Sequence, residues 1–138
     1  MFPFEKPALT NITVPPNGTL FVPISFPKVG WLTRFVCEIV SGETVPFTVR
    51  FFSRAYLDQR SDSASDSDSA EELKLYAITP EFTGLNGVAS FFTDDIGYAV
   101  STTEETPGRC FIYAGIRTTS AAPIIVNLLV AGISRRSS

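Results

Sequence analysis

The chain has 138 residues, of which 44% are hydrophobic and 18% charged, with a formal net charge of −3. This size and balance suit one domain with a well-filled core. Asp62, Asp66, Asp68, Glu71 and Glu72 supply five negative charges, so the remainder carries −3 + 5 = +2 and shows no basic stripe of the kind that binds nucleic acid. The first residues, "MFPFEKPALT", have no basic start and no long apolar run, so no secretory signal is expected there. No stretch reaches the roughly eighteen apolar residues of a membrane span.

Residues 1–10 are expected to form an extended N-terminal arm. Phe2 and Phe4 lie among Pro3 and Pro7, and such a proline-rich segment cannot form a helix. The arm is expected either to dock on its own domain or to reach onto a neighbouring subunit. Phe2 and Phe4 are therefore candidate partner-binding residues.

Two strands are predicted early in the chain, at 33–40 ("TRFVCEIV") and 45–54 ("VPFTVRFFSR"), because both are rich in β-branched and aromatic residues. We expect them to form a hairpin whose apolar faces match, with a turn at Gly42-Glu43-Thr44. The expected register pairs Phe35 with Phe51, Cys37 with Val49 and Ile39 with Phe47, and it sets Glu38 diagonal to Arg50 on the outer face.

Residues 58–72 are predicted to be a long acidic loop that contains the tract "SDSASDSDSAEE" at 61–72. A hand-type calcium loop needs alternating oxygen ligands, a glycine at its sixth position and a glutamate at its twelfth. Frames beginning at Asp62 and Asp66 both fail this test. Ser69 lies before Glu71 and Glu72 as in an acid-directed phosphorylation site, although such patterns arise by chance in any acidic serine run. A solvated connection between two strands is the favoured interpretation.

Further strands are predicted throughout the rest of the chain, and no segment shows a sustained helical period. The fold class indicated is all-β: one domain over 1–138, built as a two-sheet antiparallel sandwich of jelly-roll or Greek-key type. Turn signals at Pro16-Asn17-Gly18, Asn86-Gly87, Asp94-Asp95 and Pro107-Gly108 separate the strands. The additional strand candidates are 18–26, 73–79, 87–92, 96–100, 109–119 and 123–134.

The last strand is apolar on both faces. Ile124, Val126, Leu128 and Val130 line one face, and Ile125, Leu129 and Ala131 line the other. Strands of this kind are usually covered on both sides. The second face is expected to meet another subunit or to lie beneath a loop, so Ile125 and Leu129 are candidate partner-binding residues.

Enzymatic chemistry finds little support. The chain has no histidine, which removes the commonest general base and most transition-metal sites, and no nucleotide-binding or nucleophile motif is present. The adjacent carboxylates Asp94-Asp95 and Glu104-Glu105 could act as pairs, but solvated turns are the favoured interpretation. We expect no enzyme activity, no cofactor and no metal site. Cys37 and Cys110 are predicted to be buried free thiols.

The run "VGWLTRFVCEIVSGETVPFTVRFFSRAYL", the Phe/Pro arm before it and the apolar last strand resemble small β-sandwich cement, or decoration, proteins of tailed-bacteriophage capsids. The resemblance is one of architecture over most of the chain. It implies a virion protein made in the host cytoplasm that binds assembled major capsid protein, self-associates as a dimer or trimer, and reinforces joints between capsomers.

A carbohydrate-binding or receptor-binding sandwich of a phage tail or fibre is the main alternative. Such a site needs exposed aromatic rings beside polar groups, and Trp31 with Tyr56 could supply them. A core position is the favoured interpretation of Trp31, since tryptophan is highly buried on average. A carboxylate-based β-sandwich enzyme is the third hypothesis.

Overall fold

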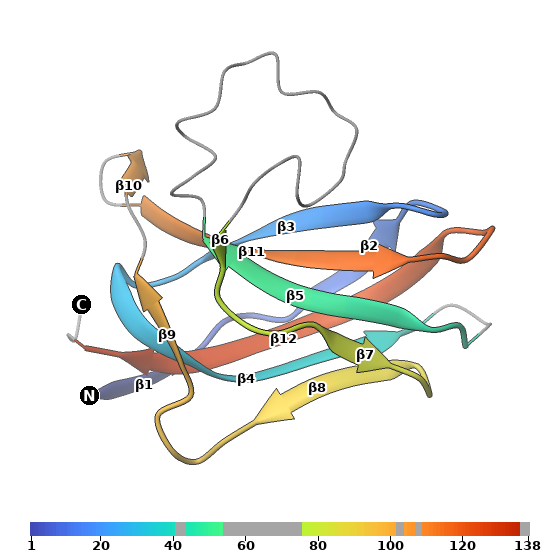
Figure 1. Cartoon of the computed structure of the whole chain (residues 1–138). Helices are drawn as coiled ribbons and strands as arrows, with labels where there is room; N and C mark the ends of the chain where they lie inside the picture. The colour runs from blue at the N-terminus through green and yellow to red at the C-terminus, as the bar shows by residue number, and fades with distance from the viewer. Residues whose placement is uncertain (41–43, 54–75, 102–103, 107–108, 136–138) are drawn as a thin grey trace.

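The computed structural model describes residues 1–40, 44–53, 76–101, 104–106 and 109–135, and it confirms the all-β, two-sheet antiparallel sandwich (Figure 1). The acidic loop expected at 58–72 lies outside these residues. The strands are β1 (Phe2–Glu5), β2 (Leu9–Val14), β3 (Thr19–Ser25), β4 (Val29–Ile39), β5 (Phe47–Ser53), β6 (Tyr76–Ala77), β7 (Phe82–Gly84), β8 (Val88–Phe92), β9 (Tyr98–Ser101), β10 (Glu104–Thr106), β11 (Arg109–Thr118) and β12 (Ile124–Ser134).

The strand order is that of a jelly roll. Sheet A contains β12 and β4 at its centre, with β1 and β2 along one side and β8 and β9 along the other. Sheet B contains β11 and β5 at its centre, with β3 and β10 along one side and β6 and β7 along the other. Strands from the two ends of the chain pair in succession (β2 with β12, β3 with β11, β4 with β8), all antiparallel. This is the pairing of one long hairpin rolled up into two sheets.

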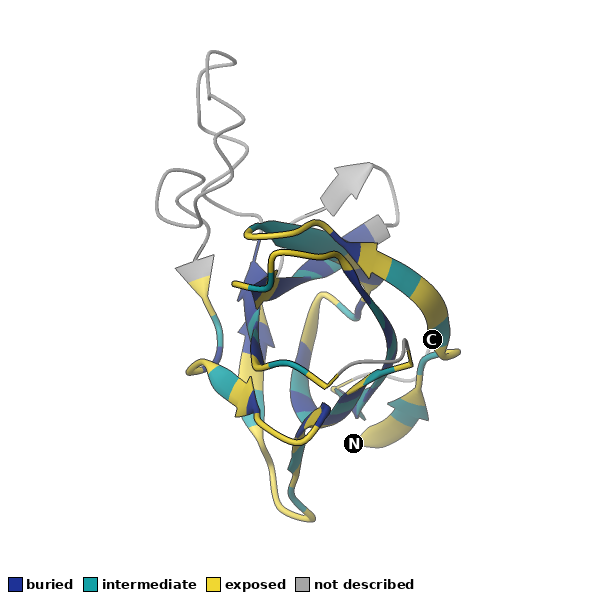
Figure 2. Ribbon diagram, turned by 90° about the vertical axis from the view of Figure 1, so that its right-hand side faces the viewer, coloured by how far each residue is buried: buried dark blue, intermediate teal, exposed yellow. Residues whose placement is uncertain are grey.

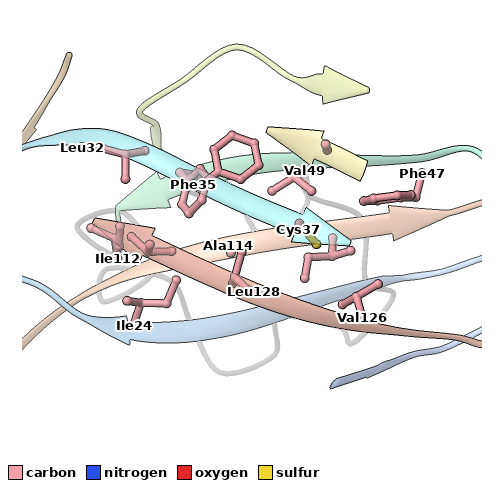
Figure 3. Close-up of a cluster of buried hydrophobic side chains, with 14 of the residues drawn as sticks. Ile24, Leu32, Phe35, Cys37, Phe47, Val49, Ile112, Ala114, Val126 and Leu128 are labelled. Carbon is pink, nitrogen blue, oxygen red and sulfur yellow. The ribbon is translucent and has the colours of Figure 1, made fainter. Parts of the chain in front are cut away.

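The core lies between the sheets and follows from the two-residue period of strands. Along β12, buried and half-buried residues alternate without exception, and the buried set contains Ile124, Val126, Leu128 and Val130, as predicted. Figure 3 shows side chains of β4 and β12 meeting those of β3, β5 and β11. Figure 2 shows that buried residues concentrate on the strands, whereas exposed ones concentrate on the connections.

The predicted hairpin of residues 33–40 and 45–54 is wrong. β4 belongs to sheet A and β5 to sheet B, so the two strands face each other across the core. Phe35 and Phe51 do meet, with ring centroids 5.1 Å apart, but as an edge-to-face contact between sheets. Two strands with matching apolar faces can bury them either as neighbours in one sheet or by packing face to face from opposite sheets. The diagonal Glu38–Arg50 pair is also wrong, because those residues lie on opposite outer faces of the sandwich.

The N-terminal segment is extended and belongs to the domain's own sheet. β1 pairs with the end of β12, from Phe2 opposite Ser134 to Glu5 opposite Ala131, and β2 pairs with its beginning. Of the two expected outcomes for residues 1–10, docking on the same domain is therefore the one observed. The short strands β7 and β10 were also not anticipated, since three residues give no readable alternation. Glu104 and Glu105 thus lie in β10 and not in a turn.

Candidate interaction surface

The outer face of sheet A carries several large apolar side chains. Alternation directs these residues away from the core, and none of them belongs to the buried cluster. Val88 and Phe92 on β8 are 45% and 70% exposed, and the other four are half-buried. Cross-strand pairs join Leu129 to Val36 and Ile133 to Trp31. We call this surface the platform; its members are Trp31, Val36, Val88, Phe92, Leu129 and Ile133.

The expectation that Trp31 lies in the core is wrong. Its neighbours in the chain, Gly30 and Leu32, are buried, so Trp31 falls on the opposite side of β4 and is half-buried. Tyr56, its expected partner in a sugar site, lies outside the described residues. The residues across from Trp31 are Ala99 on β9 and Ile133 on β12, which are both apolar. Trp31 therefore belongs to an apolar surface and has no polar side chain opposite it.

A bulge at Thr33 interrupts the platform. Ala131 lies opposite Arg34 while the next residue, Gly132, lies opposite Leu32, so Thr33 is the extra residue of β4. Its hydroxyl donates to the Ala131 carbonyl at 3.4 Å, and its carbonyl accepts from the Thr93 amide at 3.0 Å. β4 changes partner at the same point, from β8 to β9. The bulge therefore marks the point along β4 where its pairing with β8 ends and the β8–β9 connection begins.

A groove of about 470 Å³ lies beside this bulge. Its apolar lining includes Pro3, Phe92 and Ile133, and its polar lining includes the side chains of Glu5, Arg34, Asp94 and Asp95. Asp94 and Asp95 are exposed residues of a bend, as the turn interpretation predicts, and the Asp95 amide donates to the Thr93 hydroxyl at 3.0 Å. The groove thus combines an exposed aromatic ring with polar groups, next to the bulge that separates the Leu129–Val36 pair from the Ile133–Trp31 pair.

The four residues predicted to bind a partner separate into two groups. Leu129 lies at the middle of the platform, and Ile125 lies two steps of alternation away on the same outer face of β12. Phe2 is 46% exposed at the end of β1. Phe4 points the other way and packs edge-to-face on the buried Phe26, with centroids 5.1 Å apart. The Phe4 ring is half-buried and stabilises the docking of β1, and it also contributes to the lining of the groove.

On the outer face of sheet B the largest buried side chain is that of Phe52, which the chain itself covers. Phe52 points outward from β5 but is only 5% exposed. Phe21 packs against it edge-to-face at 5.6 Å, and the Arg50 guanidinium lies 5.9 Å from the centre of its ring. Gly115 makes room for this arrangement, since a Cβ there would come within 2.8 Å of the Phe52 ring. The large hydrophobic residues that are exposed on the described strands, Phe2, Val29, Val88 and Phe92, all belong to sheet A.

Both cysteines are free and buried, as predicted. Cys37 lies on the inner face of β4, opposite Leu128 and Ala89. Burial raises the pKa of the Cys37 thiol from 9.0 to about 12, and the neighbouring Glu38 carboxylate adds to this shift. A thiol that stays protonated at neutral pH is a poor nucleophile and a poor metal ligand. Cys37 is thus a packing residue.

Comparisons with known proteins identify no relative: a scan of family models, a search of curated proteins and a search of solved structures each returned no match. Within the described residues, no three His, Cys, Asp or Glu side chains gather in a way that could hold a metal ion. The same residues contain no helix able to cross a bilayer.

Proposed function

We propose that this chain is a structural virion protein that binds an assembled capsid shell and reinforces the contacts between capsomers, as a cement or decoration protein. The observation that carries the proposal is the platform. Uncovered apolar surface of this extent is typical of a protein-binding face. The jelly-roll fold by itself gives little support to this function, because the same fold occurs in capsid proteins, lectins and enzymes.

The size of the outer face of sheet A suits a protein partner. β4 and β12 have 11 residues each, which at about 3.3 Å per residue span roughly 35 Å. Four strand positions spaced by about 4.8 Å add a width of roughly 19 Å. The projected area is therefore roughly 650 Å², close to the ~800 Å² per partner of a stable interface. A shell lattice repeats this contact many times, so modest affinity per copy is sufficient.

Charged residues flank the Val36–Leu129 pair at the centre of the platform. On β4, Arg34 and Glu38 lie on either side of Val36 along the outer face, and Glu5 lies beyond Ala131 on β1. An apolar centre with a polar rim is the usual anatomy of a protein–protein interface. We infer that the central contact is made by Val36 and Leu129, and that the charged residues orient the partner.

The experiment is a rebinding assay on particles from which this protein has been stripped. Leu129→Glu, at the centre of the platform, is compared with Thr48→Glu, which places the same side chain on a half-buried, outward position of sheet B. Wild-type protein and Thr48→Glu are expected to restore occupancy and resistance of the particles to heat, whereas Leu129→Glu is not. Equal rebinding by both variants would remove the platform from the mechanism.

A second candidate, a carbohydrate-binding or receptor-binding module of a tail or fibre, is favoured by one observation. The groove places the exposed Phe92 ring beside Arg34, Asp94 and Asp95, and sugars stack on aromatic rings while bonding to polar neighbours. Binding of the purified protein to glycans, lost in Phe92→Ala and unaffected by Leu129→Glu, would support this function over capsid binding.

A further inference from the structure

β8 is an edge strand with a free side. It pairs only with β4, at one end of the order of sheet A. It lies at the margin of the sandwich in Figure 1. Eight large hydrophobic residues are exposed in the described part of the chain. Four of them lie in β8 or in the connections next to it: Leu85, Val88, Phe92 and Ile96.

The hydrogen bonds next to β8 determine which of its backbone groups are free. The Ile39 amide donates to the Gly87 carbonyl at 2.8 Å, and the Thr93 amide donates to the Thr33 carbonyl at 3.0 Å. In an antiparallel ladder, bonded and non-bonded residue pairs alternate. Ala89 and Phe91 therefore direct their amides and carbonyls to β4. Val88, Ser90 and Phe92 direct theirs to the open side, where no described strand pairs with them.

The other edge strands of the described residues are protected against pairing. Native sheets blunt their edges with proline, charge, bulges or short length. β1 and β3 contain Pro3 and Pro23, β2 is bulged at Asn11 with φ 56°, and β6, β7 and β10 have two or three residues. β9 has four residues, with only Ala99 and Ser101 facing outward. β8, "VASFF", has no proline and no charge and carries large exposed side chains.

We propose that two copies of this chain pair antiparallel along β8 across a two-fold axis at Ser90. In this register Ser90 lies opposite Ser90 of the second copy, and Val88 lies opposite Phe92 of the second copy. Each of these pairs joins residues whose backbone groups face the open side, so each exchanges two backbone hydrogen bonds. Two sheets A then form one continuous sheet across the dimer.

The side chains of β8 are complementary to themselves in this register. On the outer face Val88 meets Phe92, a β-branched and aromatic pair, which stabilises antiparallel sheets. On the inner face Ala89 meets Phe91, so a small side chain lies opposite a large one. Asp94 lies opposite Asn86, which keeps the carboxylates of the two copies from facing each other. No shift of the register by one residue would preserve the hydrogen bonds, because it would oppose free groups with bonded ones.

The pairing is independent of capsid binding, although it would place two platforms side by side on one sheet. It is tested on the purified full-length protein in solution. Sedimentation velocity over a range of concentrations is expected to show a monomer–dimer equilibrium. A monomer at every concentration up to the millimolar range would overturn the proposal.

Ser90→Pro removes the central amide donor, which in the monomer bonds to no described strand, so an edge position of this kind tolerates proline. Loss of the two central bonds is expected to weaken the dimer by about tenfold or more. Ser90→Ala, which keeps the amide, is the matched control and is expected to dimerise like the wild type. A dimer that persists unchanged in Ser90→Pro would contradict the proposal.

The register is tested by charge complementation. Val88→Lys and Phe92→Glu each introduce a charge at an exposed position, so both are expected to fold and to remain monomeric alone. Mixed together, they are expected to form a heterodimer, because Lys at 88 of one copy meets Glu at 92 of the other while Phe92 meets Val88. Failure of the mixture to associate, with both variants folded, would rule out this register.

Discussion

Adjacent leucines on β12 provide a direct test of how the sandwich is built. Leu128 is 1% exposed and lies opposite Cys37 and Leu9 on the flanking strands. Leu129 is half-buried on the platform. Leu128→Ala and Leu129→Ala delete the same atoms from neighbouring positions of one strand, so they differ only in the face from which those atoms are removed.

Burial of a leucine in a protein core makes its truncation cost about 2–5 kcal/mol, and the larger values occur where the surroundings cannot collapse. β12 is held on both sides by paired strands and faces sheet B, so little collapse is possible around Leu128. We expect Leu128→Ala to lower the free energy of unfolding by about 3 kcal/mol, or the melting temperature by about 10 °C for a domain of this size. Leu129→Ala removes partly hydrated atoms, and its expected cost is about 1 kcal/mol or less.

The assay is urea unfolding followed by the fluorescence of Trp31, at protein concentrations low enough to populate the monomer. The dependence of the free energy on denaturant should be the same for both variants, because the surface exposed on unfolding barely changes. Equal destabilisation by the two variants, or a larger effect of Leu129→Ala, would refute the assignment of inner and outer faces on which the platform depends.

Three further predictions follow from single positions. The pKa of Cys37 is raised to about 12 in the folded protein, against 9.0 in its ordinary state. Because the folded chain retains this proton, the free energy of unfolding should fall as pH rises from about 9 to 12, by up to about 1.4 kcal/mol per pH unit. Cys37→Ala should remove this contribution to the pH dependence of unfolding, and an unchanged pH dependence would contradict the prediction. Gly97→Ala should destabilise the protein by more than about 2 kcal/mol, since φ at Gly97 is +78° and a Cβ there would clash with the Leu32 carbonyl oxygen. Gly87→Ala should cost only about 1 kcal/mol, because φ is +85° but no atom lies nearer than 3.5 Å to the added Cβ. Thermal melts in which Gly87→Ala is the more destabilising variant would contradict this packing. Phe4→Ala should lower the free energy of unfolding by about 1–2 kcal/mol, because it removes the contact with Phe26. Phe2→Ala should change the melting temperature little, because Phe2 is 46% exposed. Equal effects of the two variants would mean that β1 is not docked as described.

The alternation of apolar residues was sufficient to predict the fold class and the inner faces of the long strands. Phe35, Cys37, Val49 and Phe51 are all buried, although they were assigned to a hairpin that does not exist. A period of two identifies which side of a strand is buried. It does not tell whether two strands with matching apolar faces pair within one sheet or pack against each other from opposite sheets. Sheet assignment depends on long-range pairing, and only the structure supplies it.

The candidate surface was predictable only in part. The apolar outer face of β12 pointed to Ile125 and Leu129, and the structure places Leu129 at the centre of the platform. Val36 was missed because the charged residues Arg34 and Glu38 share its face of β4, and Ile133 was missed because both sides of β12 are apolar. In β8 the adjacent Phe91 and Phe92 carried a usable signal, since two large residues in succession on an edge strand require one ring to face outward. The contact of Phe4 with Phe26 could not be predicted, because the two residues lie far apart in the chain, beyond the reach of local patterning.

The proposed function is tested most directly by cryo-electron microscopy of the native particle that contains this protein. Capsid reinforcement predicts density for the sandwich in many symmetric copies on the shell, at the joints between capsomers, with the outer face of sheet A and Leu129 against the major capsid protein. Density at the tail or a fibre instead, or copies on the shell whose sheet A faces solvent, would contradict it.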